Sequence, residues 1–166
     1  YNYGDAYGDF PTVTRTGYAL EYWYYFDNTT LVEISAYRKV ERTTDYTIRA
    51  GWKANKYTIT ADANGGTISA TTGWTVASGA KTATKKISYN DSYGTLPTVT
   101  RTGWTFAGWY DAQTGGNKIE STTKMTKPAN HTIYAHWTSD NYTITYNANG
   151  GTLAGESTVS YTITDA

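Results

Sequence analysis

An internal repeat constrains this chain more than any other feature of its sequence. The segment Pro-Thr-Val-Thr-Arg-Thr-Gly occurs at residues 11–17 and again at 97–103, so that Arg15 and Arg101 are 86 residues apart. Further matches, such as Trp52 with Trp137, have an offset of 85 residues. This period is longer than that of the common solenoid repeats, and it predicts a string of small globular modules.

The phase of the repeat divides the chain into one complete module and two partial ones. Counted from the Tyr-Thr-Ile-Thr segment at 57–60, the complete module covers residues 56–137. Residues 1–53 then form the later part of a first module, and residues 142–166 form the opening part of a third. Because the chain starts with a tyrosine and no signal peptide opens it, we expect its ends to be cut from a longer protein.

The residues favour β-structure within each module. Aromatic residues make up 16% of the chain, mostly as 17 Tyr and 6 Trp, and with the abundant Thr they fit a pleated, half-buried surface better than a helix. Alternation at 57–61 and 131–137 predicts strands, and Asn64 with Gly65 predicts a tight turn because both residues tolerate positive φ. We expect roughly four or five strands per module and at most one short helix, over 121–127.

Several motifs resemble those of a known family in content and order. They are a Tyr-Thr-Ile-Thr strand, an Asn-Gly-Gly turn, a Tyr-Gly pair, a segment ending in Thr-Arg-Thr-Gly, an aromatic strand and a closing Tyr-Ala-His-Trp, at residues 57–60, 64–66, 93–94, 96–103, 104–110 and 134–137. On these residues the chain resembles the Listeria–Bacteroides repeat, also seen as the B-repeat of bacterial internalins. The first copy departs from the pattern, since Glu21 and Tyr22 stand where the second copy has Ala107 and Gly108.

The resemblance implies a mainly β fold of small β-grasp-like modules in tandem, similar to ubiquitin and SUMO. It also implies a place on secreted or wall-attached bacterial proteins, where such repeats act as spacers, adhesion modules and sites of protein contact. No catalytic residue belongs to the family pattern, so the resemblance implies a non-catalytic chain without a cofactor.

Charge and titratable residues give little support to other functions. A net charge of +0 argues against binding of nucleic acid and against an electrostatic membrane anchor, and no apolar run is long enough to span a bilayer. The chain has no Cys, and His131 and His136, five residues apart on a predicted strand, point to opposite faces. The carboxylates are scattered in predicted turns, so we expect no catalytic site, no cofactor and no metal site.

Aromatic residues are the remaining candidates for function. One group belongs to the strand segments that match in the two copies and is interpreted as structural core: Trp23, Trp52, Trp104, Phe106, Trp109 and Trp137. A second group has no aromatic counterpart and is expected to form an exposed contact surface: Tyr22, Tyr25 and Trp74. Plain packing and contact between modules are alternatives for the second group. If these rings instead stack on sugars, the chain is a carbohydrate-binding module.

The two partial modules complement each other. The first lacks an opening hairpin and the last consists of one, so that residues 142–166 of one chain can complete residues 1–53 of the next in a head-to-tail polymer. The alternative is that the segment was cut from a longer tandem array. The sequence therefore predicts a non-catalytic extracellular repeat whose partners are neighbouring repeats, copies of itself, or a host or cell-wall protein or glycan.

Overall fold

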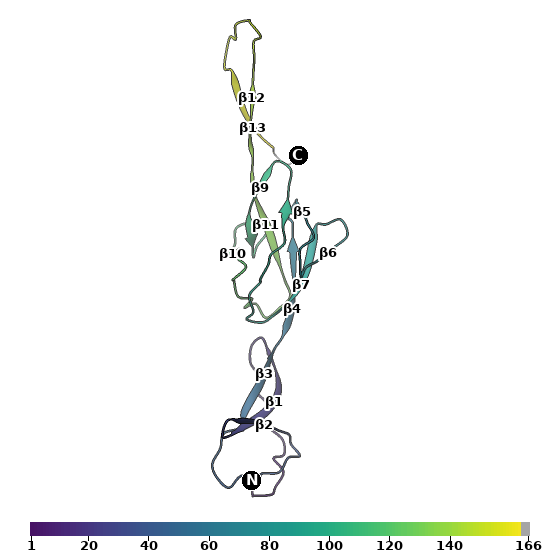
Figure 1. Ribbon diagram of the computed structural model, residues 1–166, viewed down its shortest axis with the longest axis vertical. Helices are drawn as coiled ribbons and strands as arrows, with labels where there is room; N and C mark the ends of the chain where they lie inside the picture. Colours follow the sequence, from purple (N-terminus) through teal and green to yellow (C-terminus); the bar gives the residue numbers. More distant parts are fainter. Residues whose placement is uncertain (164–166) are drawn as a thin grey trace.

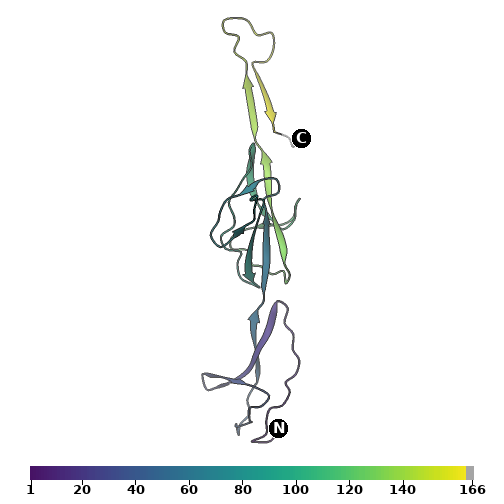
Figure 2. The same cartoon turned by 90° about the vertical axis from the view of Figure 1, so that its right-hand side faces the viewer.

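The computed structural model describes residues 1–163, which form an elongated molecule of three bodies stacked along one axis (Figure 1). The purple and blue N-terminal body, the teal and green middle body and the yellow C-terminal hairpin follow one another in chain order. The view turned by 90° shows the same extended arrangement (Figure 2). The described residues are all β, with no helix among them, which confirms the prediction of a mainly β chain.

The N-terminal body is built around a three-stranded antiparallel sheet. Its strands are β1 (Tyr18–Asp27), β2 (Thr30–Ile34) and β3 (Arg49–Ala54), in the order β2-β1-β3. The pairing of β1 with β3 shifts between Leu20 and Tyr22, so that Glu21 forms a bulge. The core of this body lies on one face of the sheet and contains the buried residues Tyr7, Tyr25, Ile34 and Val40.

The middle body covers the segment that the repeat phase predicts to be the complete module. Its strands are β4 (Lys56–Asp62), β5 (Thr67–Ile68), β6 (Thr75–Val76), β7 (Thr82–Ser88), β8 (Val99–Thr100), β9 (Trp104–Tyr110), β10 (Lys118–Ile119) and β11 (His131–Ser139). Six of them form one sheet in the order β10-β9-β11-β4-β7-β6, and β5 pairs with β8. The first and last long strands, β4 and β11, are parallel neighbours at the centre of the sheet, and the other neighbours are antiparallel.

The C-terminal body is a two-stranded antiparallel hairpin. It consists of β12 (Asn141–Thr145) and β13 (Thr158–Thr162), joined by a long loop. By the repeat, β12 corresponds to β4, since Ile144 lies 85 residues after Ile59. The antiparallel pair β12–β13 therefore corresponds to the pair β4–β7 of the middle body, and it has no core of its own among the described residues.

The loop that precedes the last strand of a module has the same backbone pairing in both larger bodies. In the N-terminal body the N–H of Val40 donates to the carbonyl of Asp5 (2.8 Å), and in the middle body the N–H of Met125 donates to that of Asp91 (2.9 Å). This pairing takes the place of the short helical turn expected over 121–127. It satisfies the backbone with bonds to another segment and directs Met125 into the core, which a local helical turn would not do.

The middle body has a continuous apolar core between the six-stranded sheet and the loops that cover one face. The core consists of Ile59, Ala61, Ala63, Ile68, Trp74, Ala83, Ile87, Tyr93, Val99, Trp109, Ile119, Met125, Ile133 and Ala135. Small alanines on the strands leave room for the large side chains that come from the loops, so the core is closed without a covering helix.

Replacing Ile59 by Ala is expected to lower the free energy of unfolding of the middle body by about 2–5 kcal/mol, because its side chain is 0% exposed. Ile144 provides the matched control, since it occupies the same position of the repeat on β12 but is 46% exposed. Ile144→Ala should cost less than about 1 kcal/mol in dilute, monomeric solution. Urea unfolding followed by tryptophan fluorescence measures both, and equal effects would contradict the assigned difference in burial.

Candidate interaction surfaces and module junctions

Two of the three predicted contact residues are buried, so the expectation that they are exposed is wrong. Trp74 is 7% exposed and belongs to the middle core, where its indole N–H donates to the carbonyl of Thr95 (2.8 Å). Tyr25 is 6% exposed and packs edge-on against Tyr46, with 5.2 Å between ring centroids. The polar sequence around Trp74 suggested an open loop, but this loop folds over the sheet and uses the indole to close the core.

Tyr22, the third predicted contact residue, is half-buried on the outer face of the N-terminal sheet. It meets Tyr24 edge-on at 5.7 Å between centroids, and Tyr24 meets Phe26 in the same way at 5.4 Å. Because alternate residues of a strand share a face, these three rings form a row opposite the core residue Tyr25. We call this row the outer aromatic ladder, and Phe26 at its end is exposed.

The departure of the first copy from the repeat pattern is compensated across the sheet. The ring of Tyr22 occupies the space where a side chain of Gly51, on the neighbouring strand, would begin. In the middle body the sizes are exchanged, since Gly108 stands in place of Tyr22 and pairs with His136 in place of Gly51. His136 then stacks on Tyr110 at 4.0 Å between centroids. Each body thus keeps one large and one small residue at this pair of positions.

The six aromatic residues interpreted as core lie in different environments. Trp109 is fully inside the middle core, and Trp137 and Trp23 are partly buried against the middle and N-terminal cores, respectively. Phe106 is 39% exposed, so its assignment to the core is wrong: it contacts the rings of Trp109 and Trp137 from outside. The bulge on β9 pairs Phe106 with Trp137, so Phe106 lies on the face of the sheet that carries the core, at the exposed margin of that core.

Trp52 and Trp104 are partly exposed and belong to neither core cluster, so their assignment to the core is also wrong. Trp52 lies on β3 opposite Leu20. Trp104 begins β9 at the end of the middle body that adjoins the C-terminal hairpin. The same repeat motif therefore supplies one tryptophan to the core and another to a contact between bodies.

The two histidines contact different groups on separate sides of the sheet. His131 makes a 2.7 Å hydrogen bond with the hydroxyl of Tyr93, and His136 bonds the carbonyl of Ala112 at 2.9 Å. Within residues 1–163, no group of three His, Cys, Asp or Glu side chains is placed to hold a metal ion. In the same residues, no helix is long and apolar enough to cross a membrane.

The shifted pKa values belong to structural hydrogen bonds. Burial, and next the hydrogen bond to Tyr46, raise the pKa of Tyr7 well above its usual range. Burial also raises the pKa of Tyr93, the residue that occupies the same position in the middle body. The hydrogen bonds that Asn117 donates lower the pKa of Asp111, whose carboxylate caps the turn after β9. These shifts favour neutral phenols in the two cores and an ionised carboxylate in a turn.

The N-terminal and middle bodies meet at Asn55, the single residue between β3 and β4. Its N–H donates to the carbonyl of Gly17 (2.9 Å), and its own carbonyl accepts from the N–H of Tyr89 (2.8 Å). Gly17 has a φ of +79°, and the ring of Tyr89 lies where a side chain on this glycine would begin. Tyr89 also meets Tyr18 edge-on at 5.5 Å, and the guanidinium of Arg15 lies 4.0 Å from the Tyr18 ring centroid.

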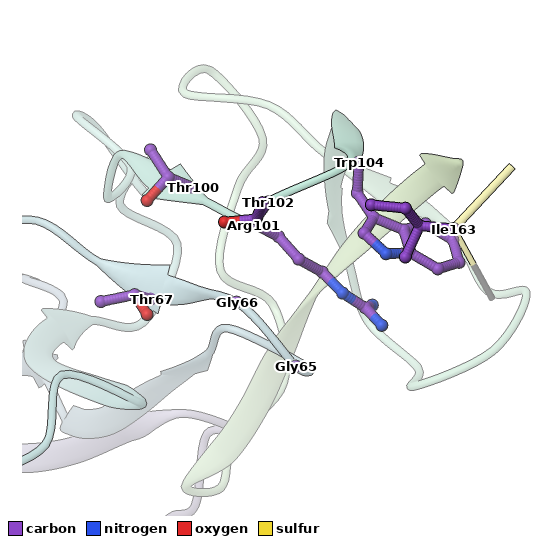
Figure 3. Close-up of a pocket in the computed structure, with 8 residues that line it drawn as sticks. All are labelled: Gly65, Gly66, Thr67, Thr100, Arg101, Thr102, Trp104 and Ile163. Atoms are coloured by element: carbon purple, nitrogen blue, oxygen red, sulfur yellow. The ribbon is translucent and has the colours of Figure 1, made fainter. Parts of the chain in front are cut away.

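The middle body and the C-terminal hairpin meet in the same way at Asp140, the single residue between β11 and β12. The N–H of Asp140 donates to the carbonyl of Gly103 (2.9 Å), whose φ is +76°. The side chain of Ile163 occupies the space in front of this glycine and lies beside the indole of Trp104 (Figure 3). The guanidinium of Arg101 is 4.1 Å from the Trp104 ring, and an open hollow of about 780 Å³ adjoins these residues.

These junction residues were not among the predicted contact sites, although part of the signal was in the sequence. Arg15, Gly17, Arg101 and Gly103 belong to the seven-residue segment that defines the repeat. The residues that they meet in the following body are Tyr89 and Ile163, which are 74 residues apart and therefore do not align at the offset of 85 or 86. The sequence shows that the turn at 15–17 recurs at 101–103. It does not show that Tyr89 and Ile163 are the residues that contact these turns, because the loops before them differ in length.

The C-terminal hairpin exposes an unusual amount of apolar surface. Its exposed large apolar residues are Ile144, Tyr146, Leu153, Val159, Tyr161 and Ile163. At the other end of the molecule, β3 is an edge strand among the described residues, whereas its counterpart β11 pairs in parallel with β4. In the described part of the chain, the C-terminal hairpin β12–β13 thus has no further strand beside it, and the N-terminal sheet has the free edge strand β3.

Comparison with known proteins places these features in a family context. Residues 57–136 and 142–165 match the model of the Listeria-Bacteroides repeat domain. Internalin H of Listeria monocytogenes is 33% identical to the chain over 96 residues. This match covers 58% of the chain and 15% of internalin H, so the chain spans only a small part of that relative's length. No solved structure matches the chain.

Proposed function

The chain belongs to the Listeria-Bacteroides repeat domain family, and we propose that it is a non-catalytic, extracellular or cell-wall-associated segment of a bacterial surface protein. In this proposal the modules act as spacers that hold other parts of the protein away from the cell, and their outer faces act as adhesive contacts. Each module is β-grasp-like, with covering loops in place of a helix. The parallel central pair β4–β11, flanked by antiparallel strands, supports this description.

The observation that carries the spacer function is the direct passage of the chain from one body into the next. Only Asn55 separates β3 from β4, and only Asp140 separates β11 from β12. The last strand of one module therefore continues along the molecule as the first strand of the next. Each added module extends the array by its own length, because the strand that ends one module runs on into the strand that begins the next (Figure 1).

The outer aromatic ladder of the N-terminal body is the adhesive contact that we propose. Tyr22, Tyr24 and Phe26 offer a continuous row of rings, and the guanidinium of Arg49 lies 5.9 Å from the Phe26 ring centroid. Aromatic and Arg side chains are enriched in protein interfaces, which favours a host or cell-wall protein as the partner. A carbohydrate-binding module is less well supported, because Tyr25 and Trp74 are buried and cannot stack on a sugar.

Binding to purified extracellular-matrix and cell-wall proteins, measured beside a glycan array, tests this function. We expect protein binding that Phe26→Ala weakens by at least about tenfold, because an exposed aromatic contact is lost without opening a core. Tyr37→Ala is the matched control, since Tyr37 is an exposed aromatic residue outside the ladder, and it should bind like the unchanged chain. Glycan binding that Tyr22→Ala removes, with folding intact, would instead establish the carbohydrate-binding alternative.

We also propose that residues 1–166, taken alone, assemble head to tail by strand complementation. The apolar face of β12 supports this idea, because Ile144 is exposed whereas Ile59 at the matched position is completely buried. In such an assembly, β12 of one copy pairs with β3 of the next as β4 pairs with β11. Where further repeats adjoin this segment, the same surfaces can be covered within one chain.

Light scattering over a range of concentrations tests the assembly. The chain 1–166 should form oligomers whose mass grows with concentration, and Ile144→Asp should return it to a monomer, because a charge cannot be buried unpaired in the completed core. Thr143→Asp is the matched control, since Thr143 is the neighbouring exposed residue on the other face of β12. A strictly monomeric and fully folded chain at all concentrations would contradict the assembly and leave the spacer function in place.

A further inference from the structure

We propose that the Arg-Thr-Gly turn and the aromatic residue after it form a socket that holds the following module in one fixed orientation. The socket consists of Arg15, Gly17 and Tyr18 in the N-terminal body, and of Arg101, Gly103 and Trp104 in the middle body. The group that it receives is the plug, defined as Tyr89 and Ile163 of the following bodies. This inference rests on the proposed spacer function and adds that the spacer is stiff.

The connecting residue itself is bound on both sides at the first junction. The N–H of Asn55 donates to the preceding body at Gly17, and its carbonyl accepts from the following body at Tyr89. Rotation about the connection would break both hydrogen bonds together. At the second junction Asp140 makes the same bond to Gly103, and its carboxylate also accepts from the hydroxyl of Thr105 (2.7 Å). At the first junction the one-residue connection is thus bonded to both bodies, and at the second junction it is bonded to the preceding body.

The socket glycine is required twice over. Its φ of +79° at Gly17 and +76° at Gly103 lies in the left-handed region, which side chains with a Cβ rarely adopt. In addition, the first atom of any side chain would overlap the ring of Tyr89 at one junction and the side chain of Ile163 at the other. The absence of a side chain therefore lets the plug rest directly against the backbone of the preceding module.

The aromatic wall of the socket is held by the arginine of the same turn. The guanidinium of Arg15 lies over the Tyr18 ring and that of Arg101 over the Trp104 ring, at nearly equal distances of 4.0 and 4.1 Å. This cation–π contact restrains the ring against which the plug packs. The arginine therefore acts on the junction indirectly, by positioning the wall.

The sizes of wall and plug are complementary at the two junctions. The smaller wall, Tyr18, meets the larger plug, Tyr89, and the larger wall, Trp104, meets the smaller plug, Ile163. The combined volume is thus kept similar while both members change, as expected for a packed contact. The pairing also gives the junction a preference for which module follows which, because Trp with Tyr would be too large for the same space.

Distance measurements between two spin labels test the socket directly. The chain contains no Cys, so Glu33→Cys on β2 and Thr84→Cys on β7 place exposed labels on strands of the two bodies that the first socket joins. We expect a single narrow distance distribution for the otherwise unchanged chain. Gly17→Ala and Tyr18→Ser should each broaden it by about twofold or more, because the freed connection then samples many orientations.

Gly4→Ala is the matched control for the glycine variant. Gly4 lies in the same body and has a φ of +89°, but nothing lies within 4 Å of the position of a Cβ, so this variant has the backbone strain without the lost contact. It should keep the narrow distribution. Tyr18 belongs to neither core cluster, so the Tyr18→Ser variant should still fold. It therefore supplies the test if Gly17→Ala fails to fold.

The outcomes separate the socket from the proposed function. A broad distribution in the unchanged chain, or a narrow one in folded Gly17→Ala and Tyr18→Ser, would overturn the socket but leave a flexible spacer. A carbohydrate-binding activity would overturn the spacer and adhesion function but leave the socket standing, provided that the distribution is narrow and the two variants broaden it.

Discussion

The single residue between the last strand of one module and the first strand of the next is the constraint on which the rest of this structure depends. Because the connections at Asn55 and Asp140 are only one residue long, each module must begin where the previous one ends. The first strand, β4, then lies beside the last strand, β11, of its own module, and β11 leads directly into β12. The extended shape follows from this connection (Figure 1), and the shared direction of β4 and β11 lets the chain enter the middle module at one end and leave it at the other.

Much of the fold could be predicted from the sequence because the signals were local or repeated. The alternation at 57–61 became β4, and the Asn64-Gly65 turn, the aromatic strand β9 and the closing strand β11 lie where the motifs indicated. The compensation between Tyr22 and Gly51 could not be foreseen in the same way. It depends on which residues face each other across β1 and β3, and the bulge at Glu21 sets that register only after the strands have paired.

The candidate contact surface was harder to predict, and the reasons are physical. Tyr22 and Tyr25 are three residues apart on β1 and lie on opposite faces, but the sequence does not show which face is covered, because the covering residues Tyr7 and Val40 come from distant loops. Trp74 was misread because its neighbours are polar, although a module without a helix needs a large side chain from a loop to close its core. The sockets were missed because their partners come from the following module.

The central claim is that consecutive modules form one stiff body rather than beads on a flexible string. Residual dipolar couplings of the backbone amides, measured for residues 1–166 in a weakly aligned medium, test this claim most directly. If the claim holds, the couplings of the N-terminal and middle bodies fit a single alignment tensor with the relative orientation of this structure. Two tensors that differ in magnitude, or a relative orientation that changes with the medium, would contradict it.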